Sequence, residues 1–222
     1  MNPYKSGILS ASIFLEDQND FCLADSQLKW KSILVHFVTI DMTSIDLAAE
    51  RCLTVYGKSE KTSSKWFPNN LLRNVARKIV GPTWFLLIDV DLRPSPNLYG
   101  KLNDFVRSQN INKMDLYLIT VFETDIKNLE IIENKNHLKK NYDSGQVRIF
   151  HSWCDICYGF YDYSKFFSLP EENLLYAAYE VKYKLSFEPY YLGNKRTVPL
   201  HDQRFRGYGY NKVIQCYEAS KD

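Results

Sequence analysis

Apolar and polar positions alternate along the chain in a pattern that predicts short strands and amphipathic helices. Residues 8–15 and 33–40 are rich in apolar and β-branched side chains, and both predict strands. The segment Phe67–Val80 repeats apolar residues at the helical period and predicts a helix that ends at Gly81-Pro82. The continuous apolar run Trp84–Ile88 follows at once and predicts a buried strand of a parallel sheet.

The second half of the chain continues this alternation. Ser95-Pro96 is a natural N-cap and first helical position, and it predicts a helix through Val106. Further elements are expected as a short helix at 23–32, a buried strand at 116–122, an exposed helix at 126–140, a strand or extended segment at 185–192, and a last helix after 199–213. Because the chain has no repeat, low-complexity tract or linker, we expect a single α/β domain over residues 1–222.

Two carboxylates follow the strand predicted at Trp84–Ile88. Asp89 and Asp91 are separated by one residue, so in an extended chain both side chains point to the same face. In open α/β sheets, ligands bind beyond the carboxyl ends of the strands. Carboxylate oxygens suit Mg²⁺ or Mn²⁺, which usually keep positions for substrate phosphates. The pattern therefore predicts a site for a divalent cation and a nucleotide diphosphate.

Two other interpretations of these carboxylates stay open. Acidic residues at a strand end often only solvate the loop or help to start the next helix. Phosphatases of the haloacid-dehalogenase type also carry Asp-x-Asp after a strand, usually with Thr or Val two places beyond the second Asp. Arg93 occupies that place here, and in those enzymes the strand normally lies near the start of the domain, so this class is disfavoured.

Composition narrows the function classes. A chain of 222 residues with 45% apolar residues can bury a proper core, and a net charge of +2 with scattered basic residues argues against a nucleic-acid partner. Aromatics make up 15% of the chain and are useful for stacking on sugar rings or bases. No window approaches the roughly 18 apolar residues of a membrane span, and the N-terminus lacks a signal-peptide core, so the chain as written predicts a soluble, cytosolic protein.

The chain contains five cysteines, of which Cys154 and Cys157 form a lone Cys-x-x-Cys pattern. A structural zinc site would need two more ligands at matching spacing, and none is evident. A disulfide and a pair of free thiols both remain open for this pair.

Several separated motifs, taken together and in order, resemble glycosyltransferase family 49. They lie at residues 67–77, 87–95, 169–175, 188–190 and 202–212. The chain is similar to the β-1,4-glucuronyltransferase members of that family, to which the glucuronyltransferase domain of LARGE-type enzymes is related. The likeness runs from about residue 8 to the end of the chain, and Cys154 and Cys157 also fall at positions where the family has cysteines.

The resemblance implies a GT-A fold, an α/β domain with a mixed central sheet flanked by helices. It implies an inverting transfer of glucuronic acid from UDP-glucuronate to a β-xylose-type acceptor on a glycoprotein during O-mannosyl glycan synthesis, with Mn²⁺ or Mg²⁺. It also implies a type II membrane protein of the Golgi with a luminal catalytic domain, as a homo-oligomer or in association with other Golgi glycosyltransferases. A related donor such as UDP-GlcNAc or UDP-xylose, and a truncated non-catalytic protein that keeps the fold, are the alternatives.

The resemblance and the chemistry together suggest roles for single residues. The metal ligands would be Asp89 and Asp91, and the residues contacting the donor would be Arg73, Asn74, Asp89 and Lys212. The general base would be Asp202, with capping of the last helix as its alternative role. The acceptor contacts would be Trp153, Glu188 and Tyr190, with core packing as the ordinary alternative for the two aromatics.

Two departures from the family pattern bear on activity. The family often has Glu at position 203, where this chain has Gln203, which cannot act as a base. The family domain also continues past the last helix with a further strand and a late His that completes the metal site, whereas this chain stops at Asp222. We therefore expect a GT-A domain without its C-terminal part. The departures favour the non-catalytic alternative, and Asp89, Asp91 and Arg73 favour a working donor site.

Overall fold

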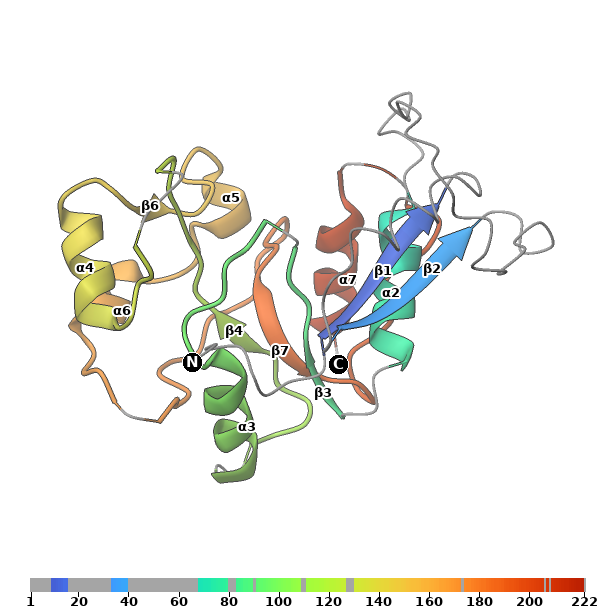
Figure 1. Ribbon diagram of the computed structural model, residues 1–222, viewed down its shortest axis with the longest axis horizontal. Coiled ribbons are helices and arrows are strands. Elements are labelled where there is room, and N and C mark those ends of the chain that lie inside the picture. The colour runs from blue at the N-terminus through green and yellow to red at the C-terminus, as the bar shows by residue number, and fades with distance from the viewer. Residues whose placement is uncertain are drawn as a thin grey trace, which may run out of the picture. The chain divides into compact units, whose positions relative to one another are not determined.

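The computed structural model forms two compact units (Figure 1). Unit 1 comprises residues 1–7, 83–199 and 212–222, and unit 2 comprises residues 8–82 and 200–211. The structure describes residues 9–15 and 33–39 by their backbone, and residues 68–79, 83–89, 91–108, 111–126, 130–172, 174–205, 207 and 209–221. The short helix expected at 23–32 lies outside the described residues. Within the described residues, no helix is both long enough and apolar enough to cross a membrane.

Unit 2 contains a parallel strand pair and one helix. Strand β1 (Leu9–Leu15) pairs with β2 (Ile33–Thr39) in a register that runs from Leu9 opposite Ile33 to Leu15 opposite Thr39. Helix α2 (Asn69–Ile79) packs beside β1, as Figure 1 shows. The two strands and the helix confirm the elements predicted from the apolar pattern.

The buried face of α2 is more polar than its apolar period suggests. Leu72 is buried, but Asn70, Asn74 and Arg77 are buried as well, with exposed fractions of 0%, 5% and 4%. These residues recur at helical spacing and share one face. Buried polar groups must find hydrogen-bond partners, and for the asparagines these come from residues 200–211, described below.

Unit 1 is built around a three-stranded sheet in the order β3-β7-β4. Strand β3 (Trp84–Leu86) and β4 (Tyr117–Ile119) lie on either side of β7 (Tyr190–Asn194), and both pair with it in antiparallel fashion. The sequence predicted a parallel sheet around the apolar run at 84–88. This prediction was wrong for the pairing of β3 with β7, which is antiparallel. An apolar run shows that a strand is buried, but not the direction of a neighbour that arrives far later in the chain.

The remaining elements of unit 1 differ from the predictions mainly in their bounds. The predicted strand at 116–122 is split into β4 and β5 (Phe122–Glu123), and β5 pairs with β6 (Arg148–Ile149). Helix α3 (Leu98–Ser108) begins after a turn closed by the Leu98 N–H donating to the Ser95 carbonyl at 3.1 Å, so Pro96 precedes the helix. The other helices are α4 (Lys135–Asp143), α5 (Asp155–Tyr158), α6 (Tyr163–Ser168) and α7 (Asn211–Ala219).

Helix α4 covers only the end of the segment predicted as a helix at 126–140. It begins after Asn134, whose side chain accepts a hydrogen bond from the His137 N–H at 2.8 Å. This N-cap determines where the helix starts, which the pattern of charged residues in the sequence does not indicate. Phe122 of β5 contacts Tyr142 of α4 and Phe167 of α6, whose rings lie 5.0 Å apart. Helices α4 and α6 accordingly lie side by side, as Figure 1 shows.

Strand β7 joins two hydrophobic clusters in the core of unit 1. One cluster contains Phe85, Tyr191, Val198 and Cys216. The other contains Tyr158, Tyr161, Phe187 and Tyr190. Successive side chains of a strand point to opposite faces, so β7 supplies Tyr190 to one cluster and Tyr191 to the other. All of β7 is buried.

The most deeply buried ring in these clusters, that of Phe187, gives a test of this core. Phe187 is 2% exposed and contacts the rings of Phe160 and Tyr161. We expect Phe187→Ala to lower the free energy of unfolding by about 3–5 kcal/mol, because it removes buried apolar surface and leaves a cavity. Equilibrium unfolding in urea, followed by tryptophan fluorescence, measures the change.

Leu185, two residues earlier, is the matched control. It is 71% exposed, so we expect Leu185→Ala to change the free energy of unfolding by no more than about 0.5 kcal/mol. Equal losses for the two variants would contradict the placement of Phe187 in the core.

Candidate functional site

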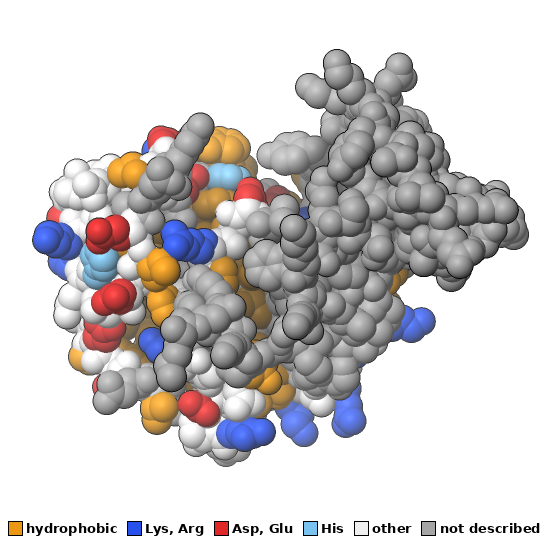
Figure 2. All heavy atoms as spheres, in the orientation of Figure 1, with side chains coloured by type: hydrophobic (Ala, Val, Ile, Leu, Met, Phe, Trp, Pro, Cys, Tyr) orange, Lys and Arg blue, Asp and Glu red, His pale blue; other side chains and the backbone are white. Residues whose placement is uncertain are grey.

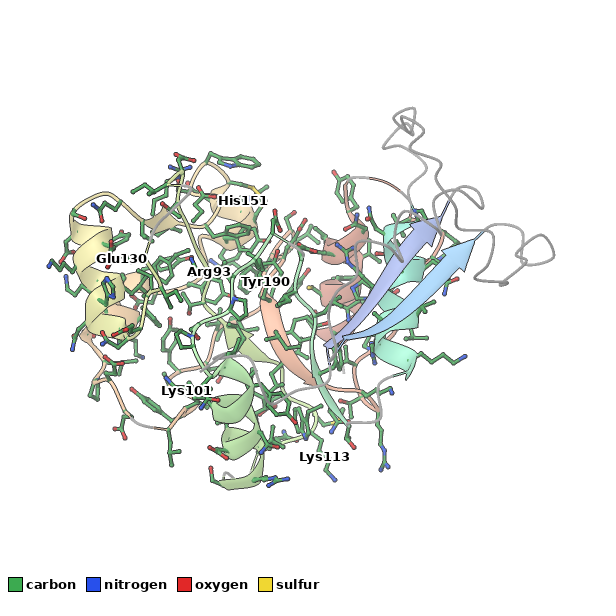
Figure 3. All side chains as sticks on the ribbon, in the orientation of Figure 1. Arg93, Lys101, Lys113, Glu130, His151 and Tyr190 are labelled. Atoms are coloured by element: carbon green, nitrogen blue, oxygen red, sulfur yellow. A yellow bond between two sulfur atoms is a disulfide. The ribbon has the colours of Figure 1, made fainter. Side chains whose placement is uncertain are left out.

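Three residues far apart in the sequence meet at the end of β3. The Oδ2 atom of Asp89 accepts a hydrogen bond from the Tyr190 hydroxyl at 2.6 Å and another from Lys212 Nζ. Lys212 Nζ also donates to the Tyr190 hydroxyl oxygen at 3.0 Å and lies 4.5 Å from the centroid of the tyrosine ring. We refer to Asp89, Tyr190 and Lys212 as the Asp89 cluster. Tyr190, from β7, is labelled in Figure 3.

The three members of the cluster differ in their exposure to solvent. Tyr190 is 6% exposed, whereas the side chains of Lys212 and Asp89 are 19% and 36% exposed. Burial raises the pKa of the Tyr190 hydroxyl, and the hydrogen bond to Asp89 and the charges of Asp89 and Asp91 raise this pKa further. The hydroxyl therefore stays protonated and donates to Asp89, while Asp89 and Lys212 form a half-buried ion pair.

Asp91 is exposed and follows Asp89 through a turn. Strand β3 ends at Leu86, and the Leu92 N–H donates to the Asp89 carbonyl at 3.1 Å. The sequence predicted an extended chain that presents both carboxylates to one face. This was wrong, because the backbone turns after Asp89 instead of remaining extended. The charge of Asp91 nevertheless contributes to raising the pKa of the Tyr190 hydroxyl, as the charge of Asp89 does. Both carboxylates therefore influence the same hydroxyl.

The donor set at this strand end fits a magnesium or manganese ion in part. Two carboxylates with phosphate oxygens and water are a usual set for such a cation. In the described part of the chain, no group of three His, Cys, Asp or Glu residues is placed to hold a metal ion. One carboxylate oxygen of Asp89 is already shared by Lys212 and Tyr190. The metal-binding role of Asp89 and Asp91 stays a prediction.

The residues expected to contact the acceptor occupy different environments. Tyr190 is part of the core, as its ordinary alternative role required, and its hydroxyl is bound to Asp89. Glu188 is partly buried. Trp153 is 73% exposed, so core packing does not account for it. The Trp153 ring centroid lies 5.2 Å from that of His151, which stacks on Phe150 at 4.0 Å.

The cysteines of the Cys-x-x-Cys pattern form a disulfide. Cys154 and Cys157 are bonded, with Cα atoms 5.4 Å apart, and the bond encloses most of α5. The Glu188 N–H donates to the Cys157 carbonyl at 3.1 Å and ties this loop to the segment that leads into β7. Of the alternatives left open by the sequence, the structure contains the disulfide. His151, on the same loop as Trp153, is labelled in Figure 3.

In unit 2, asparagines of α2 bind the main chain of residues 200–211. Asn74 and His201 form a reciprocal pair, with the Asn74 amide donating to the His201 carbonyl at 2.7 Å and the His201 N–H donating to Asn74 Oδ1 at 2.9 Å. The Asn70 amide donates to the Asp202 carbonyl at 2.8 Å, and the Asn69 amide to the Gly207 carbonyl at 2.7 Å. We call Asn69, Asn70 and Asn74 the asparagine clamp.

Arg73 belongs to the same face of α2. Its Nη1 atom donates to Asn70 Oδ1 and to Asn211 Oδ1, both at 3.1 Å. Arg73 and Asn74, both predicted to contact the donor, thus also help to fix the loop from His201 to Asn211. Their predicted role in donor binding is not tested by these contacts.

Asp202, the predicted general base, is held by a neighbouring arginine. Its carboxylate accepts hydrogen bonds from Arg204 Nε at 2.9 and 3.0 Å, from Arg204 Nη2 at 2.5 Å and from the Arg204 N–H at 2.9 Å. The side-chain bonds, and then the main-chain bond, lower the pKa of Asp202 below its ordinary value. Its alternative role as the cap of the last helix was wrong, because α7 begins at Asn211.

The sequence missed the convergence of the Asp89 cluster. Lys212 was expected near the diphosphate and Tyr190 near the acceptor, but both bind Asp89, across 123 and 101 positions of sequence. It also missed the asparagine clamp. The signal available for the clamp was the polar pair Asn70 and Asn74 at helical spacing within an amphipathic segment.

A mixed α/β chain with acidic residues at a strand end is consistent with a sugar-nucleotide-dependent glycosyltransferase. A family model described as "Glycosyl-transferase for dystroglycan" matches residues 15–220. The chain belongs to this family of glycosyltransferases, as the resemblance noted from the sequence indicates.

Curated relatives agree with this assignment. The human protein named beta-1,4-glucuronyltransferase 1 is 38% identical over 153 residues, which are 68% of this chain and 36% of that protein. Its zebrafish (Danio rerio) counterpart is 31% identical over 181 residues, 75% of this chain and 41% of that protein. Mouse xylosyl- and glucuronyltransferase LARGE1 is 30% identical over 157 residues, 69% of this chain and 20% of that protein. The chain thus spans well under half the length of these relatives.

The asparagine clamp leads to a prediction on stability. We expect Asn74→Ala to lower the free energy of unfolding by about 1–3 kcal/mol, because it leaves the buried N–H and C=O of His201 without their side-chain partner. Amide hydrogen exchange at His201 should quicken in parallel. Lys78→Ala, on an exposed position of the same helix, is the control and should leave that exchange unchanged. Unchanged exchange in Asn74→Ala would contradict the clamp.

The Asp202–Arg204 pair leads to a prediction on pH. The pKa of Asp202 is lowered in the folded protein, so its pairing stabilises the fold above the unfolded-state pKa of about 3.9 and loses this effect as pH falls through the lower folded-state value. We expect Arg204→Gln to reduce stability slightly at pH 7 and the difference from the wild type to shrink below about pH 4. Arg204 is 87% exposed, so added salt should weaken the effect.

Urea unfolding at pH 7 and pH 3 measures this difference. Arg196→Gln, at another exposed arginine, is the control. A loss of stability in Arg204→Gln that is the same at both pH values would show that the guanidinium acts in some way other than through the Asp202 charge.

Proposed function

We propose that the protein is an inverting glycosyltransferase that transfers glucuronic acid from UDP-glucuronate to a β-xylose-type acceptor. The observation that carries this proposal is the Asp89 cluster, an acidic strand end with a bound lysine, in a chain of a glycosyltransferase family. The names of the relatives, which are glucuronyltransferases, support glucuronic acid as the sugar. By the same resemblance the acceptor is an O-mannosyl glycan of a glycoprotein, and the enzyme works in the Golgi.

The donor would bind at the strand end of unit 1. Asp91 and Asp89 would hold a Mn²⁺ or Mg²⁺ ion, which when bound offsets the charge that builds up on the departing diphosphate. Lys212 would contact a phosphate as a point charge, from the first turn of a helix whose N-terminus favours anions. Arg73 can pair with a carboxylate or a phosphate through two parallel hydrogen bonds.

The acceptor hydroxyl needs a base as the new glycosidic bond forms and the bond to UDP breaks. We assign this role to Asp202, which Arg204 keeps ionised at neutral pH. The carboxylate would take the proton of the attacking hydroxyl, and the electron pair of the broken bond would leave with UDP. Gln203, beside it, has no lone pair basic enough for this role.

Trp153 and Glu188 would contact the acceptor. Trp153 exposes a large aromatic face immediately before Cys154, which the disulfide joins to Cys157, and such a face suits a sugar ring. Tyr190 is bound to Asp89, so we assign it to the donor side as a residue that orients the carboxylate.

A donor-binding protein without turnover is the second candidate. The observation that favours it is the Asp202–Arg204 pair, since a carboxylate with a lowered pKa is a weaker base. Under this alternative the Asp89 cluster would still bind a UDP-sugar, and the protein would act through its partners in the Golgi, among them other glycosyltransferases or a second copy of itself. A different donor, such as UDP-GlcNAc or UDP-xylose, would leave the cluster in the same role.

Thermal unfolding with UDP-glucuronate and Mn²⁺ tests the proposed donor site. Ligand at 100 times its dissociation constant stabilises the folded state by about 2.7 kcal/mol, which is roughly 5–10 °C in the unfolding midpoint for a chain of this size. We expect this shift to require both ligands and to disappear in Asp91→Asn, which removes an exposed carboxylate charge.

Asp104→Asn is the matched control, because Asp104 is an exposed aspartate of α3 outside the cluster, and it should keep the full shift. Release of UDP with a β-xyloside acceptor, measured on the same samples, separates the two candidates. A shift with UDP release supports the transferase, and a shift without release supports the non-catalytic alternative. The absence of any shift from folded wild-type protein would refute UDP-glucuronate as the ligand under both candidates.

A further inference from the structure

Lys212 lies where the backbone disfavours a cation. It belongs to the first turn of α7, and the N-terminus of a helix carries a partial positive charge. Its side chain is nevertheless only 19% exposed and is bound at both Asp89 and Tyr190. Without the carboxylate of Asp89, the ammonium would point into water. The ion pair with Asp89 therefore keeps it at this position.

The same carboxylate oxygen is the acceptor for both donors of the cluster. Asp89 Oδ2 takes the Lys212 ammonium and the Tyr190 hydroxyl. The charges of Asp89 and Lys212 offset each other, and the exposed carboxylate of Asp91 follows two residues later. A divalent cation that approaches both carboxylates meets one that is already neutralised. The lysine thus opposes binding of the cation as long as it stays on Asp89.

When a donor binds, its phosphate oxygens offer the Lys212 ammonium an alternative partner to Asp89. The four-carbon stem of the lysine is flexible, and the ammonium is a point charge that suits phosphate oxygens. The first turn of α7, to which it belongs, favours anions as well. The ring of Tyr190, 4.5 Å below the ammonium, can keep it close to the site by cation–π attraction, while the tyrosine hydroxyl continues to hold Asp89.

We propose that Lys212 is an exchangeable counter-ion, which neutralises Asp89 in the free protein and moves to the diphosphate of the donor as a divalent cation binds Asp89 and Asp91. This inference rests on the proposed function and adds to it an energetic coupling of the two ligands. The diphosphate draws the lysine away from Asp89 and thereby improves the cation site. By linkage, the cation improves the affinity for the diphosphate by the same factor.

The experiment measures Mn²⁺ binding to the full chain at neutral pH, from the electron paramagnetic resonance signal of free Mn²⁺, with and without saturating UDP. In the wild type, we expect UDP to raise the affinity for Mn²⁺ by about 5- to 150-fold. In Lys212→Met, the affinity for Mn²⁺ without UDP should rise, the affinity for UDP measured by calorimetry should fall, and the effect of UDP on Mn²⁺ binding should be smaller than in the wild type.

Three further variants make the result specific to this lysine. Lys212→Arg keeps the charge and should keep the weak binding of Mn²⁺ in the absence of UDP. Lys113→Met makes the same charge change at an exposed turn outside the cluster and should leave both affinities unchanged. Lys212→Gln removes the charge but keeps a hydrogen-bond donor for Asp89, and it replaces Lys212→Met if that variant does not fold.

The outcomes separate this inference from the proposed function. Wild-type protein that binds neither UDP nor Mn²⁺ overturns both. Wild-type protein that binds UDP with no effect of Mn²⁺ keeps a donor site but overturns the exchange. Coupling of the two ligands that is the same in the wild type and in Lys212→Met also overturns the exchange, while the proposed donor site stands.

Discussion

The antiparallel pairing of β7 between β3 and β4 is the constraint on which unit 1 depends. A fully buried strand must have its main chain paired on both sides, and β7 obtains both partners from segments that precede it by many residues. Its alternating side chains then enter two hydrophobic clusters, one through Tyr190 and the other through Tyr191. The same pairing places the Tyr190 hydroxyl 2.6 Å from Asp89, so the strand that closes the core also orients the acidic strand end.

The surface around this core supports a small-molecule or glycan ligand more than a polyanion. Figure 2 shows basic and acidic side chains interspersed over the visible described face of the molecule, in keeping with a net charge of only +2. Inside the Asp89 cluster, the half-buried ion pair of Asp89 and Lys212 balances one negative charge against one positive charge. A ligand that brings its own negative charge together with a divalent cation changes the local balance least, because the two additions nearly cancel. This balance supports the proposal that the cluster binds a sugar nucleotide rather than a lone anion or a lone cation.

The sequence predicted those parts of the fold that neighbouring residues determine. The bounds of β1, β2 and α2 follow from local periodicity, and the structure has them where the pattern placed them. The partner and direction of β3, the split of the 116–122 strand, and the start of α4 depend on contacts between distant segments or on one capping side chain, which periodicity does not encode. At the site, Asp89 could be found because a carboxylate after an apolar strand is a local signal. Its pairing with Lys212 could not be found, because it spans 123 positions.

The polar face of α2 shows how a helix can bury polar side chains beside its apolar ones. Asn70 and Asn74 lose water as completely as a core leucine would, and each recovers hydrogen bonds from main-chain groups of the loop that begins at His201. A leucine at either position would bury more apolar area but would remove the side-chain hydrogen bond to the carbonyl of Asp202 or His201, and the loss of such a bond at a buried group costs about 1–3 kcal/mol. Such side chains fix a loop in one conformation more strictly than apolar contacts do, because hydrogen bonds depend on direction. A fixed loop conformation suits the proposed role of Asp202, because a general base must lie within hydrogen-bond distance of the substrate hydroxyl.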